Sequence, residues 1–307
     1  MQVGQCQGFV HDRRDAVMSA GRRRGSGRHA IEVRKSDGER EAYSREKLRR
    51  SLRRAGAGAS LAEEVLADVE PRLRDGITTG KLYRMARKAL QHRSRTTAIT
   101  YSLKRALLDL GPSGFPFEQF CGRLFEALGY RVAYNQVLDG RCVRHELDIV
   151  AERDGQRLFA ECKFHNRASY RNDIKLPMYL HARSRDLSAG ENGSHDAFWV
   201  LTNTTYSEDA LTYGECEGLI LAGHNTDHYP LTRGLINQHG LHPITCLGTL
   251  KVAQKRALIE AGAILCRDLL DRPDFLEHLR LDARQHERVR NECLEVLDRG
   301  RARRESA

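Results

Sequence analysis

The feature that most restricts the fold is an alternation of strand and helix patterns over residues 115–245. Runs rich in branched and aromatic residues predict strands, and apolar residues three and four positions apart predict helices. The two central strand patterns are joined by Asp154-Gly155, which is typical of the tight turn of a β-hairpin. This order predicts an α/β domain around a mixed sheet. The expected elements are helices 117–128, 173–186 and 207–216 and strands 130–137, 144–152, 157–165, 197–202 and 218–222.

Helix-rich segments flank this α/β segment on both sides. Residues 30–110 open with two short strand patterns around Asp37-Gly38, which predicts a hairpin, and continue with helical patterns, one of them capped by Thr79. We therefore predict a multidomain α+β protein. Its expected parts are a flexible basic arm at 1–29, a hairpin-and-helix domain at 30–110, an α/β domain at 115–245 and a small all-α module at 246–298.

Composition excludes several classes of protein. A hydrophobic fraction of 40% is enough for packed cores, so global disorder is not expected. No run approaches the ~18 apolar residues that a spanning helix needs, and residues 1–29 lack the apolar segment of a signal peptide. The eight cysteines form no C-x-x-C pair, which argues against a zinc ribbon. We expect a cytoplasmic protein with reduced thiols and no membrane partner.

The net charge of +10 favours a polyanionic partner, but the charge is unevenly distributed. Residues 30–110 carry 19 basic and 11 acidic side chains, whereas residues 111–245 carry 13 basic and 17 acidic ones. The basic excess therefore lies outside the α/β segment and would attract DNA or nucleotide phosphates. The surplus of carboxylates in the α/β segment is what a metal-binding site requires.

Two neighbouring strand patterns, 145–150 (HELDIV) and 159–164 (FAECKF), carry a compact set of charged residues. Because side chains alternate along a strand, Glu161 and Lys163 are expected on one face. The hairpin would bring Asp148 beside them. The same alternation predicts a shared face for Glu146, Asp148 and Val150.

Two carboxylates and a lysine form a useful set for phosphodiester chemistry. Carboxylate oxygens are preferred ligands of Mg²⁺, which keeps several waters. Such a metal activates a water and neutralises charge that develops on the phosphate. A neighbouring ammonium group adds electrostatic stabilisation.

This set resembles the motif of the PD-(D/E)xK nuclease superfamily and, more narrowly, that of the Mrr-like restriction endonucleases. The resemblance covers about residues 115–225, and Leu147 stands where the motif has proline. It implies a restriction-endonuclease-like core and a Mg²⁺- or Mn²⁺-dependent endonuclease that hydrolyses DNA. It also implies metal binding by Asp148 and Glu161, with Lys163 positioning or activating the water.

The resemblance extends to both sides of the motif. The helix and strand patterns of residues 117–130 precede it, and those of residues 198–210 follow it. On the first helix, Glu118 would add a metal ligand or a contact to a metal-bound water. Glu118 is therefore a fourth candidate catalytic residue.

Residues 29–110 resemble the ATP-cone, the regulatory nucleotide-binding module of ribonucleotide reductases and of a reductase repressor family. Two positions depart from the family pattern: Ser36 stands where Arg is usual, and Tyr83 where His is often found. The residues that carry the resemblance are Val33–Gly38, Tyr43-x-x-x-Lys47-Leu48, Asp75–Thr79 and Tyr83.

The ATP-cone resemblance implies a role for each matching residue. Val33 would back the base, Lys35 and Lys47 would meet phosphates or ribose, and Thr79 and Tyr83 would line the base pocket. ATP or dATP would act as an effector, because the chain has no Walker A motif for hydrolysis. The alternative is a helical domain whose basic face binds nucleic acid directly.

The helical pattern of residues 250–270 resembles helix-hairpin-helix-like modules such as the C-terminal domain of the bacterial RNA polymerase α subunit. Such modules bind the DNA backbone through helix N-termini and short turns. A small helical cap or dimerisation element is the alternative.

Two rival functions remain open. One is a nucleotide-sensing DNA-binding regulator with an inactive nuclease fold, although the reductase-repressor family carries a four-cysteine zinc ribbon that this sequence lacks. The other is a nuclease specific for RNA or for junctions. A homodimer would bring two active sites to the two strands of DNA, and no residue pattern specifies it.

Overall fold

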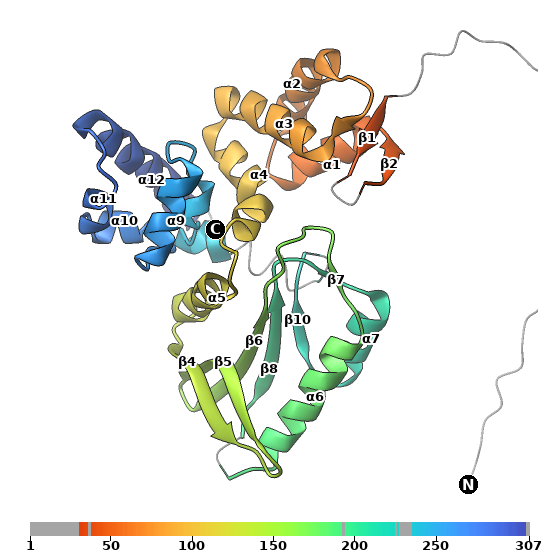
Figure 1. Ribbon diagram of the computed structural model, residues 1–307, viewed down its shortest axis with the longest axis vertical. Coiled ribbons are helices and arrows are strands. Elements are labelled where there is room, and N and C mark those ends of the chain that lie inside the picture. The colour runs from red at the N-terminus through yellow and green to blue at the C-terminus, as the bar shows by residue number, and fades with distance from the viewer. Residues whose placement is uncertain (1–30, 36–37, 192–193, 225, 227–234, 305–307) are drawn as a thin grey trace, which may run out of the picture.

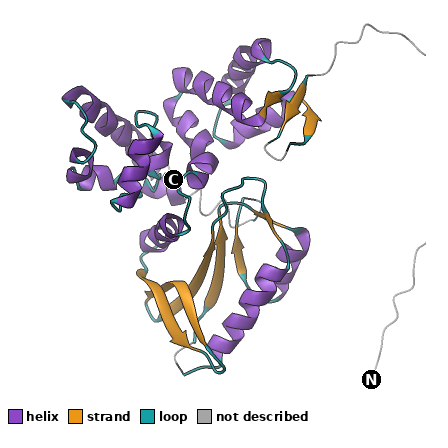
Figure 2. Ribbon diagram, in the orientation of Figure 1, coloured by secondary structure: helices purple, strands orange, loops and turns teal. Residues whose placement is uncertain are grey.

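The computed structural model describes residues 31–35, 38–191, 194–224, 226 and 235–304, so the expected arm at 1–29 lies outside the described part. Figure 1 shows three bodies: N-terminal helices with a small sheet, a larger sheet with helices beside it, and a group of C-terminal helices. The strands belong to the first two bodies, whereas the C-terminal group is helical (Figure 2). The predicted multidomain α+β architecture is confirmed at this level.

The N-terminal body is a short sheet with helices after it. Strand β1 pairs antiparallel with β2 and parallel with β3, which gives the order β2-β1-β3. Its apolar core includes Val33, Leu52 and Leu66, which are at most 4% exposed. The elements are β1 (Glu32–Arg34), β2 (Arg40–Ala42), α1 (Arg45–Arg54), α2 (Ala59–Val69), the 3₁₀ turn η1 (Glu70–Arg72), β3 (Ile77–Thr78), α3 (Thr79–Arg93) and α4 (Arg95–Leu108).

Polar side chains cap the helices of this body at their first turns. The Ser44 side chain accepts a 3.2 Å hydrogen bond from Lys47 N at the start of α1. Thr78 accepts a 3.2 Å bond from Lys81 N at the start of α3. The prediction that Thr79 caps this helix is therefore wrong by one position, because the extended backbone of the cap residue belongs to Thr78 at the end of β3.

The second body contains a mixed five-stranded sheet in the order β10-β8-β6-β5-β4. Neighbours β4, β5 and β6 are antiparallel, and β6, β8 and β10 are parallel. The predicted hairpin between β5 and β6 is confirmed, with Asp154 at φ 51° and Gly155 at φ 82°, as a tight turn requires. The strands are β4 (Arg131–Asp139), β5 (Arg144–Arg153), β6 (Gln156–Lys163), β8 (Ala197–Thr202) and β10 (Ile220–Ala222), with a separate pair β7 (Arg171–Asn172) and β9 (Thr205–Tyr206).

Helices cover the two faces of this sheet. Helix α5 (Phe115–Ala127) packs on one face through Phe117, Phe120 and Leu124. Helices α6 (Lys175–Ser188) and α7 (Glu208–Cys216) pack on the other face, in a cluster that includes Leu180 and Ala210. Ser207 caps α7 by accepting from Ala210 N at 3.2 Å.

The alternation of side chains along β4 and β5 shifts near Asn135 and Asp148. Because of this exchange of faces, alternate positions that pack against α5 on one side of this point pack against α6 on the other. Asn135 and Asp148 lie between the register pairs Tyr134–Ile149 and Gln136–Leu147. Ile149 packs in the cluster of α5, whereas Leu147, two positions away, packs in the cluster of α6. Asn135 adopts a left-handed backbone with φ 51°, which marks a local distortion of the strand pair.

This exchange corrects the prediction that Glu146, Asp148 and Val150 share one face. Val150 packs in the α6 cluster together with Leu147, although the two are three positions apart. Simple alternation therefore fails between them, and Glu146 lies on the opposite face from Val150. The distortion lies at Asp148, and its side chain belongs to neither the apolar cluster of α5 nor that of α6.

The C-terminal body is helical and begins before residue 246. Pro243 forms an antiparallel bridge with Leu265, and Ile244 N donates 2.9 Å to Ile264 O. No helix among the described residues is long and apolar enough to cross a membrane. The elements are the 3₁₀ turn η2 (Ile244–Cys246), α9 (Val252–Glu260), α10 (Asp268–Asp271), α11 (Asp274–Glu277) and α12 (Ala283–Arg304).

The C-terminal body contacts both other bodies. Thr245 Oγ1 donates 2.7 Å to the carbonyl of Ala106 on α4. Arg123 on α5 forms a 2.8 Å ion pair with Asp268 of α10. Because Ile264 shares one apolar cluster with residues of α4, α5 and the sheet, the three bodies meet in a common core.

Candidate active site

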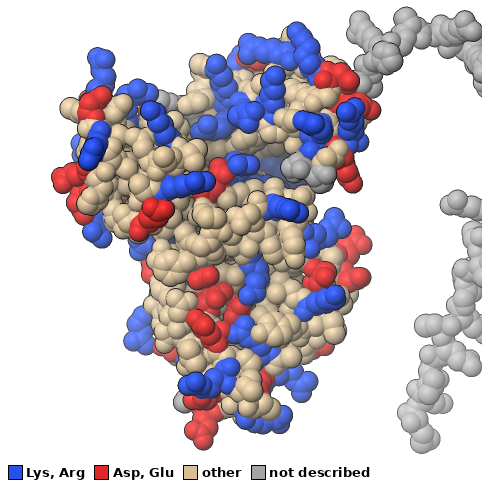
Figure 3. Space-filling view, in the orientation of Figure 1, with Lys and Arg blue, Asp and Glu red and all other residues tan. Residues whose placement is uncertain are grey.

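A cavity of about 480 Å³ opens where β5 and β6 separate. Figure 3 shows acidic side chains beside basic ones on the visible face of the sheet-containing body. The four residues that sequence reasoning selected for catalysis all line this cavity. Its lining residues are Glu118, Asn135, Arg144, His145, Glu146, Asp148, Glu161, Lys163, Tyr179 and Arg183.

The separation of the two strands creates the space for the cavity. Register pairing between β5 and β6 runs from the turn as far as Ile149 and Ala160. Beyond that pair, the Asp148 carboxylate accepts a 2.6 Å hydrogen bond from Cys162 N. Strand β6 remains paired with β8 as far as Lys163. The side chain of Asp148 therefore stands beside the backbone of β6 at the edge of the opening.

Glu161 is the most deeply buried acidic group of the cavity, with 2% of its surface exposed. Lys163 Nζ donates 2.8 Å to its Oε2. Arg183 Nη1 lies 2.8 Å from its Oε1, and Nη2 of the same guanidinium donates to the carbonyl of Glu146. Two cations thus balance one buried carboxylate, and no sequence pattern predicts Arg183 as a partner of Glu161.

The charges of the cavity influence each other's protonation. Burial raises the pKa of Asp148, and the Glu161 carboxylate raises it further, while the Cys162 amide and Lys163 oppose the shift. Burial also raises the pKa of Glu118, with added repulsion from Asp148 and Glu161. Burial disfavours the charged form of Lys163, but the charge and hydrogen bond of Glu161 outweigh it and raise the pKa. Lys163 is therefore a firmly protonated cation among crowded carboxylates.

Among the residues that the structure describes, no group of three or more His, Cys, Asp and Glu side chains is arranged to hold a metal ion. His145 lines the cavity, but its Nε2 is 2.8 Å from Oδ2 of Asp186 on α6. Asp186 also accepts from the amides of Cys142 and Val143, at 2.9 and 3.3 Å. This carboxylate fixes the end of the β4–β5 hairpin against α6 and so shapes one wall of the cavity.

The residues that the nucleotide prediction selected lie around the small N-terminal sheet. Val33 is 4% exposed and belongs to the core. Lys35 and Lys47 meet at one carboxylate, with their Nζ atoms 3.5 and 2.8 Å from Oε2 of Glu41. Thr79 follows β3, which runs parallel to β1, and therefore starts its helix at the same end of the sheet where Lys35 follows β1.

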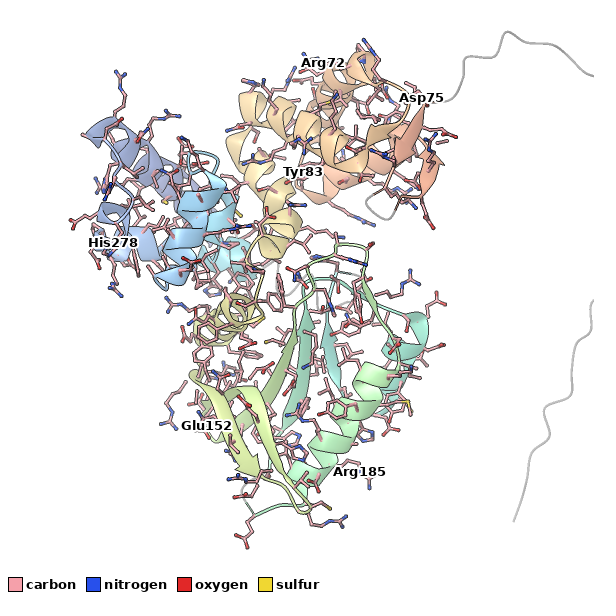
Figure 4. All side chains as sticks on the ribbon, in the orientation of Figure 1. Arg72, Asp75, Tyr83, Glu152, Arg185 and His278 are labelled. Carbon is pink, nitrogen blue, oxygen red and sulfur yellow. The ribbon has the colours of Figure 1, made fainter. Side chains whose placement is uncertain are left out.

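Tyr83 differs from the other nucleotide candidates in its surroundings. Its ring stacks on Tyr101 of α4, with ring centroids 5.2 Å apart. Figure 4 shows the labelled Tyr83 on α3 near α4, away from the labelled Asp75 beside the small sheet. Burial raises the pKa of its hydroxyl, and Cys246 of the C-terminal body is one of the groups near it. Tyr83 thus also packs toward the contact between the N-terminal and C-terminal bodies.

The comparisons with known proteins follow this division into bodies. Residues 31–109 match the ATP cone domain, and residues 242–297 match the family described as AF1548-like, C-terminal. The chain is therefore a multidomain protein that carries an ATP-cone, as the sequence predicted. The second match begins four residues before the expected start of the C-terminal module at 246.

A protein of Archaeoglobus fulgidus, described as uncharacterized, is 37% identical over 179 residues, which are 57% of this chain and 98% of that protein. The chain belongs to the same family as this archaeal protein. A crystal structure described as a protein of unknown function, AF1548, is 32% identical, with a TM-score of 0.49, and the match covers 61% of this chain and 99% of that one. The MspJI restriction endonuclease in complex with a 27-mer oligonucleotide is 13% identical, with a TM-score of 0.28, over 54% of this chain and 37% of that one.

Proposed function

We propose that the chain is a metal-dependent DNA endonuclease that hydrolyses phosphodiester bonds at the cavity between β5 and β6. The observation that carries the proposal is the gathering of Asp148, Glu161, Lys163 and Glu118 around one cavity. These residues come from three elements, α5, β5 and β6, and a purely structural strand pair has no need of them together. The rise in the pKa values of Asp148 and Glu118 supports the proposal, because crowded carboxylates favour a bound cation.

The donor set fits Mg²⁺ or Mn²⁺. Both metals prefer carboxylate oxygen, and Mg²⁺ commonly takes only one or two carboxylates, with waters and substrate phosphate completing its shell. Asp148 and Glu161 would hold the metal, with Glu118 near them. When bound, such a metal would supply Lewis-acid stabilisation and a more acidic water. Binding would require Glu161 to loosen its contacts with Lys163 or Arg183.

The residues of the chain would share the remaining steps. In hydrolysis, a water oxygen forms a bond to phosphorus as the bond to the leaving sugar oxygen breaks. Protonated Lys163 would stabilise negative charge on the phosphoryl oxygens. Glu118, whose pKa is raised, would contact the attacking water and accept its proton, and solvent water would protonate the leaving sugar oxygen.

The ATP-cone would bind ATP or dATP as an effector of this activity. Helix α4 of the cone ends at Leu108, and α5, which carries Glu118, begins at Phe115. Leu103 and Leu107 of α4 share an apolar cluster with Phe117 of α5. A change in the cone on nucleotide binding would therefore reach the helix of Glu118 through packed side chains.

The test is a cleavage assay with the wild type, Lys163→Ala and the matched control Lys88→Ala. Lys88 is an exposed lysine of α3 that is not among the cavity-lining residues. Plasmid, linear and branched DNA are incubated with Mg²⁺ or Mn²⁺, with and without ATP or dATP. We expect cleavage by the wild type and Lys88→Ala and a loss of about 10²–10³-fold in Lys163→Ala. Cleavage that survives in Lys163→Ala, or no cleavage by any protein, contradicts the proposal, and the latter outcome favours a DNA-binding regulator.

A further inference from the structure

The wall of the cavity formed by α6 carries an exposed aromatic side chain. Tyr179 lines the cavity together with Lys163 and keeps 59% of its surface exposed. Arg183, one helical turn further on, lies over one face of the ring, with Cζ 5.7 Å from the ring centroid. The exposed surface of Tyr179 therefore belongs to the other face and the edge of the ring.

The ring has a fixed support. Arg183 is only 9% exposed and is held by Glu161 and by the carbonyl of Glu146. A guanidinium over an aromatic face is an attractive arrangement that restrains both groups. Tyr179 is thus attached, through one side chain, to the buried carboxylate at the centre of the proposed active site.

Other apolar side chains are exposed on the elements that form the cavity. Met178, the preceding residue of α6, is 48% exposed. Val137 of β4 is 55% exposed and pairs in register with Glu146, one of the lining residues. A continuous DNA duplex presents phosphates at its surface and keeps its base faces stacked inside, so these apolar groups have no partner on it. An unpaired base offers a flat apolar face.

Basic side chains lie on the same helix as the ring and in the lining of the cavity. Lys175 lies one helical turn before Tyr179 on α6 and is exposed. Arg144, at the start of β5, lines the cavity and is also exposed. Surfaces that bind single-stranded nucleic acid usually combine basic side chains along the sugar-phosphate backbone with aromatic rings on which the bases stack.

We propose that Tyr179 is a stacking platform for an unpaired base, so that the site takes single-stranded segments of DNA in preference to continuous duplex. This inference rests on the proposed function of the same cavity and narrows its substrate class. Stacking on an aromatic ring tolerates every base, because every base has an apolar face. The site would therefore recognise DNA structure, such as an unpaired segment at a junction, with little dependence on sequence.

A binding experiment without metal tests the platform separately from cleavage. Oligonucleotides that carry the fluorescent base 2-aminopurine are titrated with the full chain in EDTA, in single-stranded and duplex form. The parent protein is the Lys163→Ala variant. Tyr179→Phe, Tyr179→Leu and Tyr179→Ala are each introduced into this parent. The control is Tyr170→Ala, which removes an exposed ring that stacks on His165 and does not line the cavity.

We expect the fluorescence of the single strand to be quenched by the parent, by Tyr179→Phe and by Tyr170→Ala. Tyr179→Ala and Tyr179→Leu should lose the quenching and bind about tenfold more weakly. Unchanged thermal unfolding would show that these variants fold. Equal quenching by Tyr179→Ala, or equal affinity for duplex, overturns the inference. Tighter binding of the matching RNA strand overturns the assignment to DNA.

The failure of each proposal has its own signature. If quenching follows Tyr179 but no DNA is cut by the wild type under any condition, the nuclease proposal fails and the stacking site remains. If the wild type cuts duplex as fast as single-stranded DNA and Tyr179→Ala keeps both rates, the stacking site fails and the nuclease remains.

Discussion

Arg183 of α6 reaches the buried Glu161 of β6, with Nη1 2.8 Å from Oε1. Their side chains are 10% and 2% exposed, so neither charge is well hydrated. A buried ion pair contributes little net stability, but removal of one partner leaves an uncompensated charge in the interior. This contact also joins the helix that forms one wall of the cavity to the strand that carries Glu161 and Lys163.

The first prediction concerns the stability of this ion pair. Arg183→Met should lower the free energy of unfolding by about 3 kcal/mol, because Glu161 keeps only Lys163 as a cationic partner. The measurement is urea denaturation. Arg185→Met, an exposed arginine of the same helix (Figure 4), is the control and should change stability by less than about 0.5 kcal/mol.

A double variant separates the lost charge balance from lost packing. Glu161→Met combined with Arg183→Met should recover most of the stability that Arg183→Met loses, because both members of the most buried ion pair are gone and the half-buried Lys163 still has the Asp148 carboxylate near it. If Arg183→Met is as stable as the wild type, the pair has no structural importance and this explanation is wrong.

The second prediction separates the structural role of Asp148, its hydrogen bond with Cys162 N, from the proposed chemical role of its charge. Asp148→Asn can keep the hydrogen bond from Cys162 N through its amide oxygen, but it loses the charge. We expect an unchanged unfolding midpoint and a fall in metal-dependent cleavage of about 100-fold or more. Asp148→Ala loses the hydrogen bond as well and should also be destabilised by about 1–3 kcal/mol. Full cleavage by folded Asp148→Asn would exclude Asp148 as a metal ligand.

The sequence predicts those features of the fold that depend on neighbouring residues. Asp154-Gly155 specifies a tight turn by its own backbone preferences, and this turn brings two strands together whatever else the chain does. Helix and strand patterns depend in the same way on local spacing. The prediction for the cap of α3 is wrong by one residue because Thr78 and Thr79 are chemically identical, and only the end of β3 distinguishes them.

Other features depend on contacts between remote segments. Arg183 lies on α6 and Glu161 on β6, with β7 between them in the chain. No local pattern distinguishes Arg183 from Arg185, which stays exposed. The exchange of faces near Asp148 coincides with the left-handed backbone of Asn135 in the neighbouring strand. Alternation along one strand cannot reveal a distortion that the strand shares with its partner.

The third prediction is an acid dependence from Asp186. The hydrogen bond from His145 and those from two backbone amides lower the pKa of this carboxyl to about 2. Because the folded value is below that of the unfolded chain, about 3.9, the group stabilises the fold above about pH 4, and the effect disappears as the pH falls toward 2. Asp186→Asn should therefore be less stable than the wild type at pH 6, with the difference shrinking toward pH 2.

Thermal unfolding at a series of pH values measures this difference. Asp139→Asn, which changes an exposed carboxylate on the same hairpin, is the matched control and should follow the wild type. A difference between Asp186→Asn and the wild type that stays constant from pH 6 to pH 2 would contradict the assignment.

The fourth prediction concerns His242, which is 5% exposed at the start of the C-terminal body. Burial lowers its pKa to about 4. Between about pH 6.5 and pH 4, the unfolded chain binds a proton that the folded chain does not, so stability falls as the pH is lowered through this range. The loss amounts to at most about 3 kcal/mol. His242→Leu should flatten this part of the pH profile, as measured by urea denaturation.

A second histidine of the same body provides the control. His278, labelled in Figure 4, is exposed at the end of α11, and His278→Leu should leave the slope between pH 6.5 and pH 4 unchanged. The prediction is wrong if His242→Leu keeps the slope of the wild type.

The last prediction concerns the charges of the ATP-cone. Glu41 pairs with Lys47 and Lys35, and the hydrogen bond from Lys47 lowers the pKa of the Glu41 carboxyl. A nucleotide phosphate that meets these lysines must compete with Glu41 for them. Glu41→Gln should therefore bind ATP or dATP several-fold more tightly, and Lys47→Ala about tenfold more weakly.

Isothermal titration calorimetry of the full chain gives both affinities. Lys88→Ala, which removes an exposed lysine farther along α3, is the control for net charge and should bind like the wild type. If the nucleotide phosphates meet the lysines, the two variants must change the affinity in opposite directions, because one removes a competitor and the other removes a donor. A parallel change, or equal weakening by Lys88→Ala, would mean that the nucleotide responds only to the overall charge of the cone.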